Sequence, residues 1–378
     1  MKTHINPAIL KWARERNKLT IEQLATKTKR NPEELKRWED GEQDLPYGFL
    51  EDLAYKHFKI PLAVFFFPEP PSEPDPVNKF RRLPDFELER LSDDAYRKIR
   101  LAQAYQDSLS MLLEDFQSRK IFKDIIPQNQ SVTELATIVR KYIGISIEEQ
   151  FSFRSVEAAF KRWRHAVEEC GIFTFKDSFK DRFISGFCLI DDKYPVIFIN
   201  NSSAFSRQIF TLMHELAHIL FGVVGITDID ETYVSFMNKA DRDKEIFCNK
   251  FAANLLVPDS DFEKDIVIFK RDGMVSVSRI AEKYSLSREV ILRRLLDGGV
   301  ITDTIYQKEA QELNQEYLRL HKDGGGGNYY LTQLAYLGEG YTKVAYEQYQ
   351  SGRLDKIDLA NHLNVNAKNL DKLVSYLR

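Results

Sequence analysis

The chain has 378 residues, of which 43% are hydrophobic and 29% are charged. This balance is typical of globular proteins with two or three domains, and it excludes a small disulfide-stapled scaffold and a disordered chain. Lys and Arg number 54 against 57 Asp and Glu, for a net charge of −3. No global basic field therefore indicates a nucleic-acid-binding protein, and any contact with DNA must be local.

Two further features bear on the compartment. The three cysteines are an odd number and include no CxxC pair, which favours reduced thiols in the cytosol. The longest apolar run, Leu62–Phe67, is far shorter than the ~20 residues that span a bilayer. We therefore expect a cytoplasmic protein without a membrane partner.

Residues 1–67 carry closely spaced signals for helix starts. Pro7, Asn31-Pro32 and Pro46 each suit a first helical turn, and Thr20 begins a capping box. The pattern predicts a compact bundle of about five short helices.

A proline-rich linker, residues 68–90, follows this domain. Five prolines lie between Pro68 and Pro76, which predicts an extended, semi-rigid backbone. Residues 91–150 then read as a helical connector, with a long helix over Leu91–Phe116 and another over Val132–Ile143.

Residues 151–300 combine helices with short strands. A helical pattern covers Ser155–Glu169, and three β-rich stretches bounded by turn residues come after it: Gly171–Phe175, Ile184–Ile190 and Pro195–Asn200. Asn200–Ser203 are expected to cap a long, largely buried helix that Gly222 ends. The fold class predicted is therefore mainly α with a small β-sheet (α+β).

This buried helix contains an HExxH motif. His214 and His218 lie four residues apart, so both imidazoles can reach one tetrahedral cation from the same helix face. Glu215 between them can be aimed at a water molecule on the metal and take its proton as the water attacks a peptide carbonyl. We expect a metal site, because two core histidines alone would not require this glutamate.

A hydrolytic zinc site needs a third protein ligand. Glu245, 27 residues after His218, lies in a helix predicted over Asp241–Leu256. Its spacing leaves a solvated first-turn glutamate, favoured by the helix dipole, as an equal alternative. Cys248 is a competing ligand, although as a small apolar residue it suits the packed side of the helix better.

The remaining chain reads as helical. Ser278–Leu295 has the rhythm of a helix-turn-helix around Ser285-Leu286-Ser287, for which packing against the catalytic helices is favoured over DNA reading. Residues 301–378 form a helical C-terminal module with a hinge or tight loop at Gly324–Gly327. Its clustered tyrosines are most simply core residues, but they also suit an interface, so we expect a partner or effector contact here.

Three phrases resemble the ImmA/IrrE family of metallo-endopeptidases: Pro195–Asn200, Phe210–His218, and Glu245 with the run to Pro258. The resemblance implies a zincin-like fold with His214, His218 and Glu245 as ligands of one Zn²⁺, another divalent ion such as Mn²⁺ staying open. It also implies Glu215 as the catalytic base. Val196–Asn200 would be the sheet edge to which a substrate peptide adds.

Residues 1–67 resemble an Xre-type helix-turn-helix domain, through motifs that include Leu24-Ala25 and Trp38–Gly41. The resemblance implies a second helix that enters the major groove of double-stranded DNA. The candidate contacts are Lys29, Arg30, Lys36 and Arg37.

Two features weaken the expectation of DNA binding. The turn carries Lys29-Arg30 where such domains usually have a glycine, and Glu33-Glu34 place negative charge nearby. Residues 1–67 hold twelve Lys and Arg against ten Asp and Glu, a thin excess for a strong binder. A protein-docking module is therefore the alternative.

These features predict a zinc endopeptidase fused to a DNA-binding regulator. The resemblance to the ImmA/IrrE family implies that its substrate would be a repressor or antitoxin-like protein that controls stress or mobile-element genes. The rival hypothesis is a non-proteolytic transcription factor or antitoxin-like protein that retains a metal site. The oligomeric state stays open, with a dimer among the options.

Overall fold

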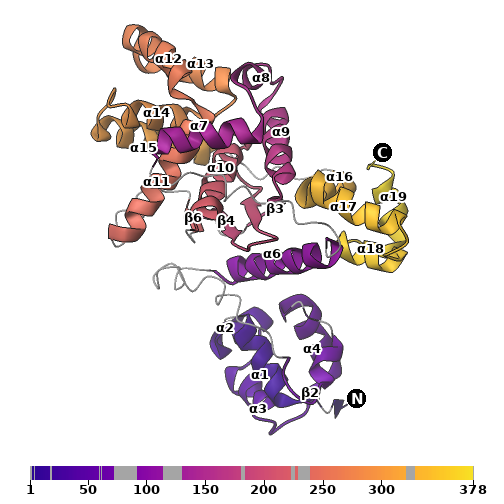
Figure 1. The fold of residues 1–378 in the computed structure, drawn as a ribbon. Coiled ribbons are helices and arrows are strands. Elements are labelled where there is room, and N and C mark those ends of the chain that lie inside the picture. The colour runs from indigo at the N-terminus through magenta and orange to yellow at the C-terminus, as the bar shows by residue number, and fades with distance from the viewer. Residues whose placement is uncertain are drawn as a thin grey trace. The chain divides into compact units, whose positions relative to one another are not determined.

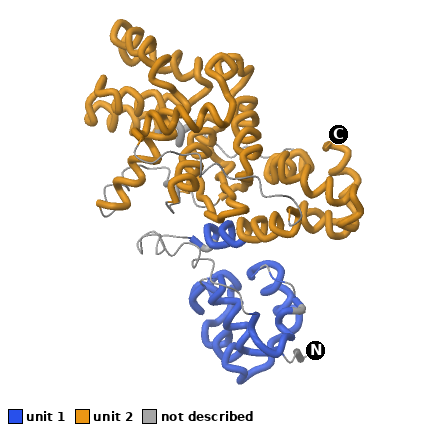
Figure 2. The backbone as a smooth tube through the Cα atoms, viewed as in Figure 1, with its two compact units in different colours: residues 1–78, 90–100 blue, residues 79–89, 101–378 orange. Residues whose placement is uncertain are grey.

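The computed structural model describes most of the chain, in the residue ranges 2–3, 5–17, 19–58, 60, 62–71, 92–113, 130–179, 184–222, 226–228, 239–320 and 328–377. Residues 72–90 of the predicted linker and the glycine run 324–327 lie outside these ranges. The chain divides into two compact units (Figure 2): unit 1 comprises residues 1–78 and 90–100, and unit 2 comprises residues 79–89 and 101–378. The finer division into five segments stays a prediction.

Unit 1 is a bundle of short helices with one small antiparallel strand pair (Figure 1). Its elements are β1 (Lys2–Thr3), α1 (Pro7–Arg16), α2 (Ile21–Thr28), α3 (Pro32–Glu39), β2 (Leu45–Pro46), α4 (Tyr47–Asp52), a π-helical turn (Leu53–Phe58) and a 3-10 turn (Leu62–Phe66). The predicted capping box at Thr20 is present, with Gln23 as its partner. Asn6 and Asn31 cap α1 and α3, each with a proline in the first turn, so the helices begin where the sequence indicated.

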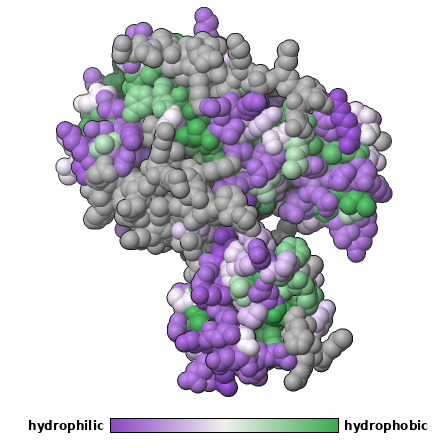
Figure 3. Space-filling view, turned by 60° about the horizontal axis from the view of Figure 1, so that its bottom comes forward, coloured by the Kyte–Doolittle hydropathy of each residue, from purple (hydrophilic) through white to green (hydrophobic). Residues whose placement is uncertain are grey.

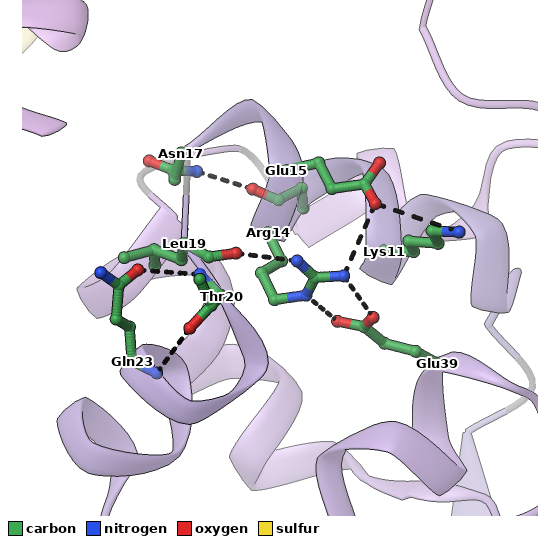
Figure 4. A network of polar contacts seen from close by, with 9 residues as sticks. Lys11, Arg14, Glu15, Asn17, Leu19, Thr20, Gln23 and Glu39 are labelled. Atoms are coloured by element: carbon green, nitrogen blue, oxygen red, sulfur yellow. Dashed lines mark hydrogen bonds and ion pairs between the residues drawn. The ribbon is translucent and has the colours of Figure 1, made fainter. Parts of the chain in front are cut away.

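A buried ion pair joins the first and third helices of this bundle (Figure 4). Nε and Nη2 of Arg14 donate to the two carboxylate oxygens of Glu39 over 2.7 and 2.9 Å, and Nη1 donates to the Leu19 carbonyl over 2.8 Å. Bidentate geometry of this kind satisfies both charges away from water. It fixes α3 against α1 and thereby sets which face of α3 turns outward.

Unit 2 holds the four-stranded sheet and the longest helices, except that residues 93–100 of α6 belong to unit 1. Its helices are α6 (Asp93–Leu112), α7 (Val132–Ile143), α8 (Ile147–Phe151), α9 (Val156–Glu169), α10 (Phe205–Phe221), α11 (Lys239–Leu256), α12 (Asp259–Asp272), α13 (Ser276–Tyr284), α14 (Arg288–Asp297), α15 (Asp303–Leu320), α16 (Tyr329–Leu337), α17 (Glu339–Gln350), α18 (Lys356–His362) and α19 (Leu370–Val374). Short 3-10 turns cover Gly273–Val275 and Ala367–Asn369. The fold class, mainly α with a small sheet, is confirmed, whereas α12 was not anticipated from the sequence.

The sheet of unit 2 has the strand order β3-β5-β4-β6. Its strands are β3 (Phe173–Asp177), β4 (Ile184–Leu189), β5 (Val196–Asn200) and β6 (Ile226–Asp228). β5 pairs in parallel with β3 and antiparallel with β4, and β6 pairs antiparallel with β4. The prediction that Val196–Asn200 forms a sheet edge is therefore wrong, because both sides of β5 are already paired.

Three turns between helices in the described residues share one backbone conformation. The described non-glycine residues with positive φ are Lys29 (55°), Ser285 (57°) and Asn364 (51°). Each lies four residues after an alanine, and the next N–H donates to that alanine's carbonyl: Arg30 to Ala25, Leu286 to Ala281 and Val365 to Ala360. The turn in unit 1 thus adopts the left-handed conformation that glycine favours, with Lys29 in that position.

The helices after the turns at Lys29 and Ser285 differ in how deeply they are buried. In α14, which comes after Ser285, the residues from Val290 to Leu295 are all buried, and α14 packs against α11 and α15. This supports the interpretation of Ser278–Leu295 as a packing element. In α3, which comes after Lys29, Lys36 and Arg37 are exposed.

The C-terminal helices α16–α19 form one cluster (yellow in Figure 1) that is tied to the sheet and to α9. Nη1 of Arg164 in α9 donates to the Ala335 carbonyl over 2.6 Å, and Nε donates to Glu168 over 3.0 Å. Glu168 in turn accepts from the Gly340 N–H over 3.1 Å. Because Arg164 and Glu168 are both buried, loss of these partners within the intact fold would leave buried charges unsatisfied.

Helix α6 supplies a second attachment for the same cluster. Ser108 Oγ lies 2.5 Å from the Tyr341 hydroxyl and 2.5 Å from His362 Nδ1. The ring of Tyr341 packs edge-on against Phe175 of β3 and is fully buried, whereas Tyr329 is 54% exposed. The tail tyrosines therefore include a core residue, and the expected partner contact of this module stays a prediction.

Hydrophobic side chains of unit 2 form one large core around α10 and α11, and unit 1 has its own core. The face shown in Figure 3 is mostly hydrophilic where it is described, with smaller hydrophobic areas between. None of the helices in the described ranges is both long and apolar enough to cross a bilayer.

Two glycines with positive φ test the attachment of the C-terminal cluster. A Cβ at Gly338 (φ 87°) would collide with the guanidinium of Arg164 and lie 2.8 Å from Oε1 of Glu168, whereas a Cβ at Gly352 (φ 75°) meets nothing within 4 Å. Gly352→Ala should lower the free energy of unfolding by about 1–2 kcal/mol through backbone strain. Gly338→Ala should cost about 2 kcal/mol more, because the clash adds to that strain. Equal losses in denaturant titrations of the two variants would show that the Arg164 contact contributes nothing.

Candidate metal centre

Helix α10 carries the HExxH motif through the centre of unit 2. His214, Glu215 and His218 have exposed fractions of 1% or less. Gly222, in the left-handed conformation with φ 68°, ends the helix as predicted. Apolar residues on several faces of α10 pack into the large core, so the polar motif is held away from water.

The predicted cap of this helix is wrong. Its N-cap is Ala204, which has no capping side chain. The Asn200 side chain instead donates to the Ile184 carbonyl over 2.7 Å and accepts from the Phe179 N–H over 3.2 Å. Asn200 therefore ties the strands together at the start of α10, an arrangement that depends on contacts far apart in the sequence.

Helix α11 packs against α10 and brings a third donor to the motif. Glu245 is 4% exposed, so it is no solvated first-turn glutamate. Its Oε2 lies 3.2 Å from Nε2 of His214, and its Oε1 lies 3.3 Å from Nε2 of His218. The sequence did not decide whether Glu245 is a ligand or a solvated glutamate. The structure places its carboxylate beside both imidazoles.

The three side chains converge on one point. The two Nε2 atoms lie 2.8 Å apart, and ligand atoms of His214, His218 and Glu245 all fall within 4.8 Å of one another. Ligands at 2.0–2.1 Å from a tetrahedral Zn²⁺ are separated by about 3.3 Å. Two imidazole nitrogens and one carboxylate oxygen at these separations fit a small divalent cation.

Cys248, the competing ligand, lies on another side of His218. Its Sγ is 3.8 Å from Nδ1 of that ring, the nitrogen other than the one that faces Glu245. Burial, and then the carboxylates of Glu245 and Glu215, raise the pKa of the Cys248 thiol well above its ordinary value. The metal-free protein therefore favours a neutral thiol here, and the Sγ lies at Nδ1 of His218, whereas Glu245 lies at Nε2.

Charge at the site favours a cation. Burial alone would lower the pKa of His214, but the hydrogen bond and charge of Glu245 outweigh it and raise the pKa above its ordinary value. The same carboxylate that stabilises a proton on the ring would stabilise a metal ion there. Protons and metal therefore compete, and the affinity for metal should fall as the pH falls through the raised pKa of His214.

Glu215 lies beside the group and under strand β4. A Cβ built at Gly186 of β4 would come within 2.6 Å of Thr211 Cγ2 and 3.7 Å of Glu215 Oε1. Glycine at this position thus lets the β4 backbone pass close to α10. Burial, followed by the charge of Glu215, raises the pKa of Cys188 well above its ordinary value, so this thiol also stays neutral.

Sequence reasoning missed the role of Asn249. Its Oδ1 lies 2.9 Å from Nδ1 of His214, so it contacts the imidazole on the side away from Glu245. The available signal was its spacing of four residues from Glu245, which puts both side chains on one face of α11.

The predicted DNA contacts lie in unit 1, separate from the metal group in unit 2. Lys29, Lys36 and Arg37 are exposed. Arg30 lies over the Phe49 ring at 4.9 Å and 3.8 Å from Glu34. Arg30 is nevertheless exposed as well, so all four predicted cations face solvent.

Comparison with known families identifies the region around the metal group. Residues 167–296, about a third of the chain, match the Peptidase M78 family, whose model is described as the IrrE N-terminal-like domain. Peptidases of this family depend on a metal, and the match supports the ImmA/IrrE metallopeptidase family for this region. A search of curated proteins found no match to the chain.

Substitution of the candidate ligands should separate them from their neighbours. His214→Ala, His218→Ala and Glu245→Ala should each reduce metal affinity by at least about 100-fold, since one of three protein ligands is lost. Cys248→Ala should change the affinity less than about threefold. Metal-competition titrations can measure this, and a large loss on Cys248→Ala with none on Glu245→Ala would reverse the assignment.

Proposed function

Because residues 167–296 match a metallopeptidase family, we propose that this chain is a zinc-dependent endopeptidase joined to a DNA-binding regulatory domain. The observation that carries the proposal is the convergence of His214, His218 and Glu245 within 4.8 Å, with Glu215 in the same buried helix. Three protein ligands leave a fourth position open, as catalytic zinc sites require.

In the proposed reaction, His214, His218 and Glu245 hold the zinc. When bound, the ion supplies Lewis acidity that polarises a peptide carbonyl and lowers the pKa of water. Glu215 takes the proton from the attacking water and returns it to the leaving amine. Its burial beside the apolar core of α10 keeps bulk water from competing for that carboxylate.

The substrate would approach in extended form along β6, the edge strand next to β4. One sheet edge, β3, is covered by α16, which packs against it, and β5 is paired on both sides. The other edge strand of the described sheet is the short β6, which pairs with β4, and β4 passes close to Glu215 through Gly186. Peptide addition to a strand edge supplies main-chain hydrogen bonds with little demand on side chains.

The substrate class and compartment are proposed from the predicted regulatory role. A repressor or antitoxin-like protein is the proposed substrate, and the cytoplasm is the proposed compartment. The three cysteines are buried and form no disulfide with one another, as proteins of a reducing compartment usually have them.

DNA binding by unit 1 is the second half of the proposal. Its support is the helix-turn-helix geometry of α2 and α3, with Lys29, Lys36 and Arg37 exposed. The Arg14–Glu39 pair fixes α3, which carries Lys36 and Arg37, against α1. Glu33 and Glu34 oppose binding, so a protein-docking module remains the alternative for this surface.

A purely non-proteolytic regulator with a metal site is the rival function. A structural zinc site is normally closed by four protein ligands, and the described group has three. This difference favours hydrolysis.

Glu215→Gln tests the peptidase. Glutamine keeps the size of the side chain but cannot take a proton, so turnover should fall by about 10²–10⁴-fold while metal affinity stays within about threefold. New protein N-termini in cell extracts incubated with zinc-loaded wild-type or variant protein report the cleavage. If both proteins produce the same N-termini, Glu215 is no catalytic base. If neither produces any while both bind zinc, the result favours a non-proteolytic regulator.

Lys36→Glu combined with Arg37→Glu tests DNA binding. Loss of two cations and gain of two anions at α3 should weaken binding to DNA from the protein's own promoter region by at least about tenfold at fixed salt, and reduce the salt dependence. Lys11→Glu with Lys56→Glu is the matched control, because it makes the same charge change in α1 and the π-helical turn. Equal weakening by both pairs would indicate nonspecific charge, and no weakening by either would favour a protein-docking module.

A further inference from the structure

The three candidate ligands alone do not determine how the His214 ring is oriented, and Asn249 contacts that ring. We propose that Asn249 is a positioning residue, which holds the His214 ring so that Nε2 faces the metal position. The inference rests on the proposed metal site, and it adds the determinant of how one ligand is presented.

With the amide oriented as in the structure, the hydrogen bond runs from the His214 ring to Asn249. Asn249 Oδ1 lies 2.9 Å from His214 Nδ1, and an amide oxygen can only accept. Nδ1 must therefore carry the proton. A neutral imidazole has one such proton, so Nε2 keeps its lone pair, and Nε2 is the atom that faces Glu245 and His218.

Burial makes this hydrogen bond difficult to replace. His214 is 1% exposed and Asn249 is 7% exposed, so water has little access to replace a lost acceptor. Without the acceptor, the ring could rotate or carry its proton on Nε2. Either change would remove the lone pair from the metal position.

One helix supplies both the third ligand and the residue that orients the first. Glu245 and Asn249 are separated by four residues on α11, as His214 and His218 are on α10. Packing of the two helices therefore places a carboxylate on one side of His214 and an amide on the other. The second histidine has a weaker neighbour at Nδ1, the Cys248 Sγ at 3.8 Å.

Two other roles must be separated from this one. Asn249 could contribute only to packing, or its amide could be turned so that Nδ2 donates to His214. Aspartate distinguishes these alternatives because it is similar in shape and only accepts. Asn249→Asp should therefore keep the Zn²⁺ affinity if His214 requires an acceptor, and lose it if His214 requires a donor.

The experiment compares Asn249→Ala and Asn249→Asp with wild type, each as the full chain. Asn254→Ala is the matched control, because Asn254 is a second buried asparagine of α11 whose Nδ2 donates to the Lys250 carbonyl over 2.7 Å. Zn²⁺ affinity is measured by competition with a chelating dye. Circular dichroism and thermal melting establish that each variant is folded.

We expect Asn249→Ala to raise the Kd for Zn²⁺ by about 10–100-fold, and Asn249→Asp and Asn254→Ala to stay within about threefold of wild type. In the zinc-loaded wild-type protein, the ¹⁵N-attached proton on His214 Nδ1 should be visible by NMR and exchange slowly. In Asn249→Ala it should exchange faster, an effect that lost packing elsewhere in α11 would not cause.

Three results would overturn the inference. Zinc affinity of folded Asn249→Ala within threefold of wild type would remove the positioning role. A Kd for Asn249→Asp as high as that of Asn249→Ala would show that an acceptor is not what His214 requires. If wild type binds neither Zn²⁺ nor Mn²⁺, the proposed metal function fails and this inference fails with it, whereas absence of peptide cleavage by a zinc-loaded protein would contradict the peptidase alone.

Discussion

The packing of α10 against α11 places two imidazoles and a carboxylate together inside an apolar core. Desolvation makes such a cluster unfavourable unless its charges are compensated. A divalent cation compensates them, because it attracts the carboxylate and both Nε2 lone pairs at once. The remaining features of the site, including the buried Glu215 and the hydrogen bond from His214 to Asn249, depend on this two-helix contact.

A second buried charge pair organises the periphery of unit 2. Arg164 of α9 donates to the Ala335 carbonyl of α16, and Glu168 accepts from the Gly340 N–H of α17. Gly338, which lies between these two residues, has no Cβ and so leaves room for the guanidinium. The C-terminal cluster is thus attached to the same sheet whose strand β4 passes Glu215. The C-terminal cluster therefore contacts β3 and α9 directly, and its expected partner contact stays a prediction.

Local sequence signals predicted much of this architecture. The positions of Gly222, Thr20 and Asn31 identified helix boundaries, and the HExxH spacing identified one helix face, because these features depend on neighbouring residues. The strand order did not follow from local pattern: β5 is central because β3 and β4 pair with it from both sides, and pairing is a long-range property. The cap assigned to Asn200 failed for the same reason, since its side chain bonds to Phe179 and Ile184 instead.

The candidate site was predictable to a similar degree. His214 and His218 define each other through spacing, but Glu245 became distinguishable from a solvated glutamate only through its burial against α10. Asn249 carried a spacing signal whose meaning depended on the facing helix. X-ray absorption of the zinc-loaded protein measures whether the chain binds one metal ion through two imidazoles and one carboxylate. We expect one ion per chain with only nitrogen and oxygen neighbours at about 2.0–2.1 Å. A sulfur neighbour at about 2.3 Å would instead make Cys248 or Cys188 a ligand and exclude this ligand set.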